Sequence, residues 1–218
     1  MRIFIILLLV STVAKVFGQT DFNSLLQNVR TINLPYKTEG LENIVREKKI
    51  LNSSDSIFIV TKLNSKNART INPYGISTFG QIDCENPSDC QKLKNIKEIA
   101  ILWFIKVAAD SYILHLEFEE NAQLGMRFGA LVSINKNGEL IDWFFSNGTA
   151  NEGNPHGNVT RDFTIQNDMT ILIDETSWGD NTTTYKFKAE FKIASRAYEN
   201  NSDYRKGEFQ LKSLCINY

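Results

Sequence analysis

The sequence has little net charge and few histidines or cysteines, and each scarcity narrows what the protein can do. Its 24 Lys and Arg side chains are balanced by 25 Asp and Glu, for a formal net charge of −1. Such a mild, mixed charge argues against nucleic acid or an anionic membrane surface as the main partner. At 11% aromatic and 22% charged residues, the chain is expected to fold rather than remain disordered. Its 218 residues suffice for one domain with a sizeable core.

Sequence motifs of common enzymes and metal sites are also missing. The chain contains no G-x-S-x-G, no P-loop and no dinucleotide-binding fingerprint. Its two histidines, His115 and His156, form neither H-x-H nor H-E-x-x-H spacing, so nothing specifies a zinc site. We therefore expect no cofactor, no metal and no catalytic residue. The leading interpretation is a non-enzymatic protein with a binding or structural role.

The first 18 residues follow the pattern of a signal peptide. A basic start at Arg2 precedes the apolar run Ile3–Val10, which is shorter than the roughly 20 residues that span a bilayer. Val16 and Gly18 are suited to signal-peptidase cleavage after Gly18. We predict a signal peptide over residues 1–18, export to the periplasm, the outer surface or the medium, and no membrane span in the mature chain.

Three cysteines follow the leader. Cys84 and Cys90 enclose five residues that are rich in turn formers, and in an oxidising compartment a disulfide would close this loop. A loop of this size gains about 2–3 kcal/mol from the cross-link. Cys215 has the same strand parity as Phe209 and Leu211, so we expect a buried, inert thiol there.

Residues 98–218 have the pattern of an antiparallel β-meander. Apolar residues alternate with Lys and Glu over residues 185–193, and a period of two recurs in several of about eight strand-like segments, while residues 100–107 are nearly all apolar. Asn137-Gly138 between two such segments indicates a hairpin with a type I′ turn. Parallel pairing would need helix-length connections, and none follows residue 98. We predict a mainly β fold in which the meander forms a curled sheet, a sandwich or an open barrel.

Residues 19–97 are expected to pack on this sheet as part of the same domain. Apolar residues have helical spacing over residues 21–30 and again over residues 41–51. The region therefore predicts one or two short N-terminal helices, with loops after them.

Polar residues on the strand near residue 115 offer one set of candidate chemical groups. His115, Glu117 and Glu119 alternate with apolar neighbours, which predicts the solvated side of a half-buried strand. The alternative is a metal or acid–base patch, or a glycan hydrolase that uses Glu117, Glu119 or Asp142. Carboxylates two residues apart on one strand face lie roughly 7 Å apart, which is within the range of an inverting pair.

Aromatic residues offer the second set. Trp143 and Phe144 are neighbours on one strand and so point to opposite faces, while Trp178 comes before a polar loop. Exposed Trp rings that stack on sugars would make the protein a carbohydrate-binding module, with Trp143, Phe144 and Trp178 as the ligand-binding residues. The simpler interpretation is a core on both sides of the strand, with the loop Trp folded over it.

Four segments resemble a known group of proteins. They are Ile32–Tyr36, Tyr74–Gly80, Tyr112–Leu116 and Ser133–Asp142. Together with the leader, they resemble uncharacterised exported β-rich proteins of Bacteroidota-type bacteria, which run from a leader through a short Leu-Pro segment into a β-meander with an Asn-Gly hairpin. The resemblance implies a cell-envelope address, where the partner would be an envelope or extracellular ligand such as a glycan. It implies no activity.

Overall fold

The structure is a computed structural model in which the placement of most of the chain after residue 21 is described. The described residues are 22–38, 48–69, 93, 96–108, 111–120, 127–150, 158–178, 184–193 and 207–217. The signal peptide at residues 1–18 and the proposed Cys84–Cys90 disulfide lie outside them and remain predictions. A mass measurement of the mature protein before and after reduction tests the disulfide.

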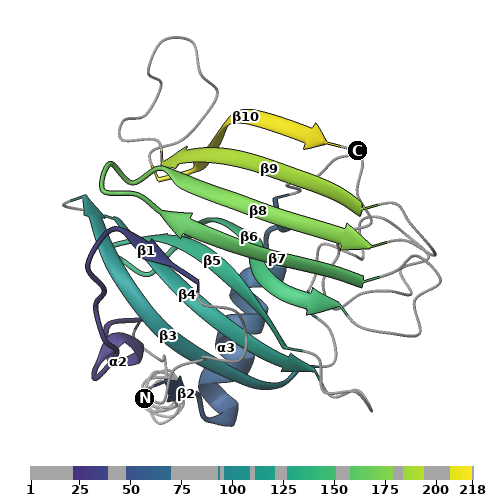
Figure 1. The fold of residues 1–218 in the computed structure, drawn as a ribbon. Helices are drawn as coiled ribbons and strands as arrows, with labels where there is room; N and C mark the ends of the chain where they lie inside the picture. Colours follow the sequence, from purple (N-terminus) through teal and green to yellow (C-terminus); the bar gives the residue numbers. More distant parts are fainter. Residues whose placement is uncertain are drawn as a thin grey trace, which may run out of the picture.

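One antiparallel sheet, which is not closed, dominates the described part of the chain, as predicted (Figure 1). Its spatial order is β10-β9-β8-β7-β6-β5-β4-β3-β2, with β1 beside β7. Because β1 and β2 join the meander, the sheet has ten strands rather than about eight. The strands are β1 (Tyr36–Lys37), β2 (Lys49–Ile50), β3 (Ile96–Ala108), β4 (Ser111–Glu120), β5 (Arg127–Asn135), β6 (Leu140–Ala150), β7 (Asn158–Ile165), β8 (Ile171–Trp178), β9 (Thr184–Ile193) and β10 (Phe209–Asn217).

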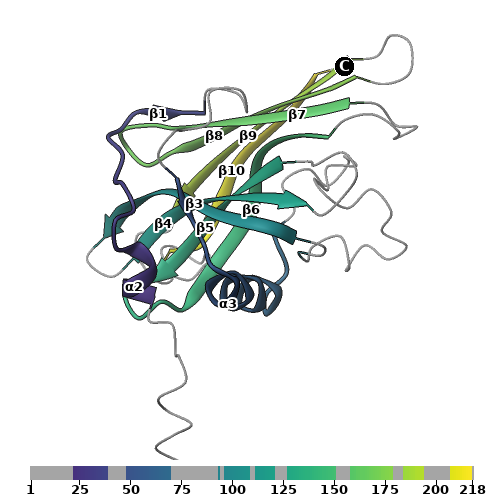
Figure 2. The same cartoon turned by 90° about the horizontal axis from the view of Figure 1, so that it is seen from below.

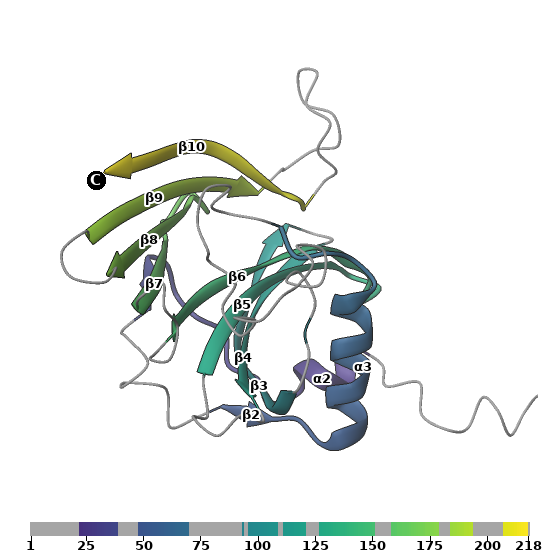
Figure 3. The same ribbon diagram turned by 90° about the vertical axis from the view of Figure 1, so that its right-hand side faces the viewer.

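The sheet bends into two layers between β6 and β7. These strands pair only where Gly148–Ala150 meet Val159–Arg161, and beyond that point β7 pairs with β1 instead. Strands β3–β6 form one layer and β7–β10 the other (Figures 1 and 3). Helices α2 (Phe22–Leu26) and α3 (Ser53–Asn64) cover the face of β3–β6 that points away from the second layer (Figure 2).

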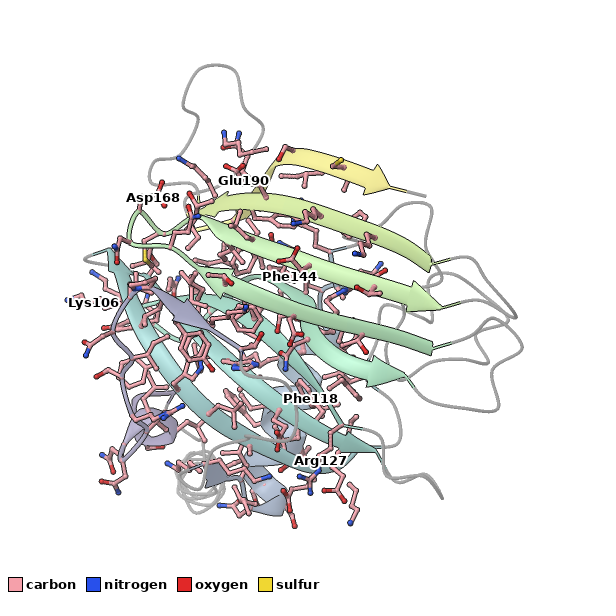
Figure 4. All side chains as sticks on the ribbon, in the orientation of Figure 1. Lys106, Phe118, Arg127, Phe144, Asp168 and Glu190 are labelled. Carbon is pink, nitrogen blue, oxygen red and sulfur yellow. The ribbon has the colours of Figure 1, made fainter. Side chains whose placement is uncertain are left out.

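Both faces of the β3–β6 layer are consequently buried. Between this layer and the helices lies a core that includes Leu114, Leu116 and Phe118 of β4. Between the two layers lies a second core that includes Ile113 of the same strand and Phe144 of β6. Figure 4 shows charged residues such as Arg127 toward the periphery, at the ends of strands.

Helix α3 is not the helix that the periodicity predicted. The expected helix over residues 41–51 is wrong at its end, because Lys49–Ile50 form β2 beside β3, and its residues 41–47 lie outside the described part of the chain. The helix starts after Asn52, whose Oδ1 accepts a hydrogen bond from the Asp55 amide at 2.9 Å. Ile59 and Leu63, four residues apart, then bury one helix face on the sheet.

The Asn135–Glu139 hairpin turn also differs from the prediction. A type I′ turn needs a positive φ at both Asn137 and Gly138, but only Gly138 has one, at 75°. The Gly138 amide donates to the Asn135 carbonyl at 3.0 Å, and the Asn135 amide to the Glu139 carbonyl at 3.0 Å. This pattern fits a type I turn followed by a left-handed glycine, the three-residue form of hairpin.

Cys215 is exposed, so the prediction of a buried thiol is wrong. Leu211 pairs with Phe191, but Ser213 already pairs with Glu190, so Lys212 is an extra residue in β10. Such a β-bulge reverses the facing of the residues after it. Cys215 therefore pairs with Lys188 on the solvent side of the layer.

Candidate functional site

The polar residues of β4 lie inside the protein, which corrects the prediction of a solvated strand face. His115 is 1% exposed and Glu117 is 4% exposed. A period of two along a strand shows which residues share a face, but it does not show that a second layer covers that face. Strands β7–β10 provide that cover. Glu119, near the end of β4, is only half-buried.

His115 is held by a hydrogen bond to Asn147 of β6. Its Nε2 lies 2.8 Å from Asn147 Oδ1, which also accepts a hydrogen bond from Ser146 Oγ at 2.9 Å. Ser146 is an extra residue in the β5–β6 register, because Ala130 pairs with Phe145 while Gly129 pairs with Asn147. This bulge turns the Asn147 side chain toward His115. Strand β6 continues past this bulge to Ala150.

Gly129 provides the space for this contact. A Cβ at Gly129 would lie 2.1 Å from Asn147 Oδ1 and 2.7 Å from His115 Nε2. Both distances are below 3.0 Å, a separation that real Cβ atoms essentially never show. The absence of a side chain at this position is therefore required for the pair of His115 and Asn147 to form.

His115 is neutral at physiological pH. Complete burial lowers its pKa to about 4, against the smaller opposing effect of the hydrogen bond that the ring donates to Asn147, and the charge of Arg30 lowers it further. Asn147 Oδ1 has no hydrogen to give, so the hydrogen of the neutral ring is on Nε2. His115 Nδ1 is left as a hydrogen-bond acceptor, and it has no partner among the described residues.

Aromatic rings of β3 and β7 contact His115, and a ring of β1 packs on these two rings. Trp103 of β3 is its cross-strand partner, with ring centroids 5.1 Å apart, and Phe163 of β7 meets it edge to face at 5.1 Å. The ring centroids of Tyr36 of β1 and Trp103 are 4.9 Å apart. Because β1 replaces β6 beside β7 at this end, the N-terminal segment places Tyr36 on these rings.

Glu117 connects this interior to the edge of the sheet. Lys48 Nζ lies 2.7 Å from Glu117 Oε1 and 3.2 Å from Glu98 Oε1. Partial burial disfavours the charge of Lys48, but the hydrogen bonds and charges of the two glutamates outweigh this and raise its pKa. Glu117 Oε2 is buried and has no hydrogen-bond partner among the described residues.

The opposite layer contributes a buried ion pair. Arg161 of β7 and Glu175 of β8 are cross-strand partners, and Arg161 Nε lies 2.7 Å from Glu175 Oε2. Arg161 Nη1 donates to the Phe145 carbonyl at 2.7 Å, which ties this layer to β6. Both charges are thus matched within the protein.

Four buried polar atoms in the described residues have no hydrogen-bond partner. They lie on three neighbouring strands, and their residues all face the space between the layers. An unmet buried donor or acceptor costs about 1–3 kcal/mol, so native proteins keep few of them. The four atoms are Trp103 Nε1, His115 Nδ1, Glu117 Oε2 and Ser133 Oγ.

Two of the three aromatic residues proposed for sugar binding lie in the core, and the side chain of the third is outside the described part of the structure. Trp143 and Phe144 are both fully buried, on opposite faces of β6, so they form no surface platform. Trp143 Nε1 donates to the Lys66 carbonyl at 2.8 Å, and Phe144 packs against Phe191 and Phe209. Trp178 ends β8, and its side chain is outside the described part of the structure.

Each carboxylate proposed for hydrolysis is paired with a basic side chain, Glu117 with Lys48 as described above. Glu119 contacts Lys97 and Arg127, whose hydrogen bonds and charges lower its pKa. Asp142 lies on β6, where its Oδ2 is 2.7 Å from Arg69 Nη2 and accepts from the Phe209 amide at 3.1 Å. The structure thus brings His115 and Glu117 into one interior cluster, but not Glu119 or Asp142.

Sequence reasoning missed the residues that complete the cluster. Neither Trp103 nor Asn147 was among the candidate residues. The useful signal was that His115 and Glu117 lie on a strand whose neighbouring strands are apolar. Polar residues in the middle of such a sheet are buried if a second layer exists, and they then need partners.

No protein-family model, no curated protein and no solved structure matches the chain. The class is therefore defined by the fold and the site alone: an open, two-layered antiparallel sheet with a polar cluster in its interior. No helix in the described part of the chain is long and apolar enough to span a membrane. Within the same part, no three His, Cys, Asp or Glu side chains gather as metal ligands.

Proposed function

We propose that the protein is an exported, non-enzymatic binding protein whose ligand lies between the two layers of the sheet. The observation that carries this proposal is the set of four unpartnered polar atoms on one interior face. Binding sites for small molecules are mostly apolar and contain a few convergent polar groups, which is the composition of this region. The leader over residues 1–18 supports export.

The state of the cluster favours binding over catalysis. A general base works best when its pKa is near the working pH, whereas burial holds the pKa of His115 at about 4. Glu117 is engaged by Lys48, and Arg161 by Glu175. These groups are suited to orienting a ligand and not to exchanging protons with it.

A purely structural role would leave the unmet groups unexplained. At about 1–3 kcal/mol each, four unmet groups are a large fraction of the 5–15 kcal/mol by which domains are stable. A bound molecule that satisfies some of them would offset this cost.

Native mass spectrometry and a thermal-shift panel test the proposal on the mature protein. A ligand at a hundred times its Kd stabilises the fold by about 2.7 kcal/mol. We expect at least one small, largely apolar molecule to do so. Trp103→Phe should weaken this stabilisation. Trp143 is also buried, but its indole N–H already donates to the Lys66 carbonyl, so Trp143→Phe should not weaken it. A broad panel without any bound or stabilising molecule would contradict the proposal.

A further inference from the structure

Residues 30–38, which we call the strap, connect the two layers of the sheet along the surface of the protein. Figure 2 shows this segment running along one side of the molecule from α2 to β1, which lies beside β7. Every second side chain of the strap is exposed: Thr31, Asn33, Pro35 and Lys37. The strap therefore covers one side of the space between the layers from outside.

The strap is attached to the first layer at a single point on β3. The Phe104 amide donates to the Arg30 carbonyl at 3.1 Å, and Thr31 and Phe104 form an isolated parallel bridge. Arg30 Nε donates to the Leu102 carbonyl at 3.2 Å. These bonds hold the first two residues of the strap.

The attachment to the second layer is also short. Strand β1 pairs with the end of β7 over two residues. Just beyond it, the Thr38 amide donates to the Phe163 carbonyl at 3.0 Å, and Thr38 Oγ1 accepts from the Phe163 amide at 2.9 Å. Strands β4 and β5, in contrast, pair over nine residues each.

Between these two attachments the strap packs shallowly. Ile32, Leu34 and Tyr36 point toward the core between the layers, but all three are only half-buried. The ring of Tyr36 lies on that of Trp103, with the centroids 4.9 Å apart. A segment with few ladder hydrogen bonds and little buried apolar surface has the features of a unit that opens before the rest of the fold.

Helix α2 gives the strap a fixed starting point. Leu25 of this helix is 1% exposed, and Lys49 Nζ lies 2.9–3.2 Å from the carbonyls of Ser24, Leu25 and Gln27. Asn28, which follows, has a positive φ of 63°, so the chain changes direction there. An open strap would stay tethered to the protein through α2.

We propose that the strap is a conformational gate: it releases from β3 and β7 as one unit while α2 and the sheet stay folded, and this release admits solvent to the space between the layers. The inference goes beyond the proposed function, because it concerns the motion of the protein alone and holds whichever molecule the interior binds.

Two indole N–H groups report on this motion from opposite faces of the β3–β6 layer. Trp103 Nε1 lies beneath Tyr36 and has no hydrogen-bond partner in the described part of the chain, so its hydrogen exchanges once water reaches it. Trp143 belongs to the core beneath the helices, and its Nε1 donates to the Lys66 carbonyl. Opening of the strap should expose the first indole and leave the second protected.

Hydrogen exchange followed by NMR in low concentrations of urea tests the inference on the mature protein. The amides of Thr38, Phe163 and Phe104 and the indole of Trp103 should exchange with one common free energy of opening, below that of the β4–β5 amides. Their exchange should also depend only weakly on urea, because opening the strap exposes little surface. Exchange of these groups with the free energy and urea dependence of the β4–β5 amides would overturn the inference.

Thr38→Val tests whether the two attachments act together. This variant removes the acceptor of the Phe163 amide, so faster exchange at Phe163 alone would show only a local effect and would overturn the inference. A strap that opens as a unit should exchange roughly tenfold faster at the Phe104 amide and the Trp103 indole as well.

Thr170→Val is the matched control. Thr170 is also buried, and its side chain hydrogen-bonds to Asp168 at the β7–β8 turn, away from the strap. It should leave the exchange of Phe104 and Trp103 unchanged. If Thr38→Val fails to fold, the urea series on the unmodified protein still decides the question. Because no ligand is added, a negative result overturns the gate and leaves the proposed function to its own test.

Discussion

The buried imidazole of His115 makes the stability of the protein depend on pH in a defined window. In the unfolded chain this histidine has the ordinary pKa of 6.5, and in the folded protein burial lowers it to about 4. Between these values the unfolded chain binds a proton that the folded protein does not. The stability that comes from keeping His115 neutral is therefore fully present above the pKa of the unfolded chain, 6.5. It is lost as the pH falls toward the pKa of the folded protein, about 4.

The magnitude follows from the difference of the two pKa values. Each unit corresponds to about 1.4 kcal/mol, so the loss is about 2 kcal/mol at pH 5 and about 3 kcal/mol at pH 4. For a protein whose free energy of unfolding is about 5–15 kcal/mol, this is a large fraction.

Urea unfolding followed by tryptophan fluorescence at pH 7, 6 and 5 measures this loss. His115→Gln keeps an N–H that can reach Asn147 but does not titrate, so this variant should lack about 2 kcal/mol of the loss between pH 7 and pH 5. His156→Gln, at the other histidine, is the control for composition and should behave as the unmodified protein. Identical pH profiles for the unmodified protein and His115→Gln would refute the reasoning.

Three further predictions concern single side chains. Gly129→Ala should lower the free energy of unfolding by about 1–3 kcal/mol in urea, because the added Cβ overlaps Asn147; a loss below about 0.5 kcal/mol would argue against the close packing. Ser133→Ala should leave the free energy of unfolding unchanged or raise it, since it removes a buried hydroxyl without a hydrogen-bond partner among the described residues. Ser146→Ala should lower it by about 1 kcal/mol, because it removes a donor to Asn147. The reverse order would contradict the hydrogen bonding described. Cys215 should react with a thiol reagent in the folded protein because it is exposed, and protection of this thiol until unfolding would contradict the bulge in β10.

The architecture was largely predictable from the sequence because the signal is local. Alternating residues in β9 and a short turn between β5 and β6 determine antiparallel neighbours without knowledge of the rest of the chain. The errors arose where local patterns depend on distant partners. Lys49–Ile50 form a strand only because β3 lies beside them, and the extra residue Lys212 reverses the facing of Cys215 in a way that parity alone does not reveal.

The site was less predictable than the fold. The sequence identified His115 and Glu117 as one face of a strand but assigned that face to solvent. Their burial depends on the bend between β6 and β7, which brings residues about 50 positions later over them. The role of Gly129 depends on a bulge at Ser146, and no pattern within β5 alone indicates it.

The indole N–H resonances of the protein provide the most direct test of the interior binding site. The chain has three tryptophans, and the variants Trp103→Phe and Trp143→Phe assign two of the resonances. During titration with a ligand that the thermal-shift panel identifies, the Trp103 resonance should move to the position of a hydrogen-bonded indole, while that of Trp143, already bonded to Lys66, stays in place. A Trp103 resonance that remains unchanged at saturating ligand, or that moves no more than that of Trp143, would contradict the account.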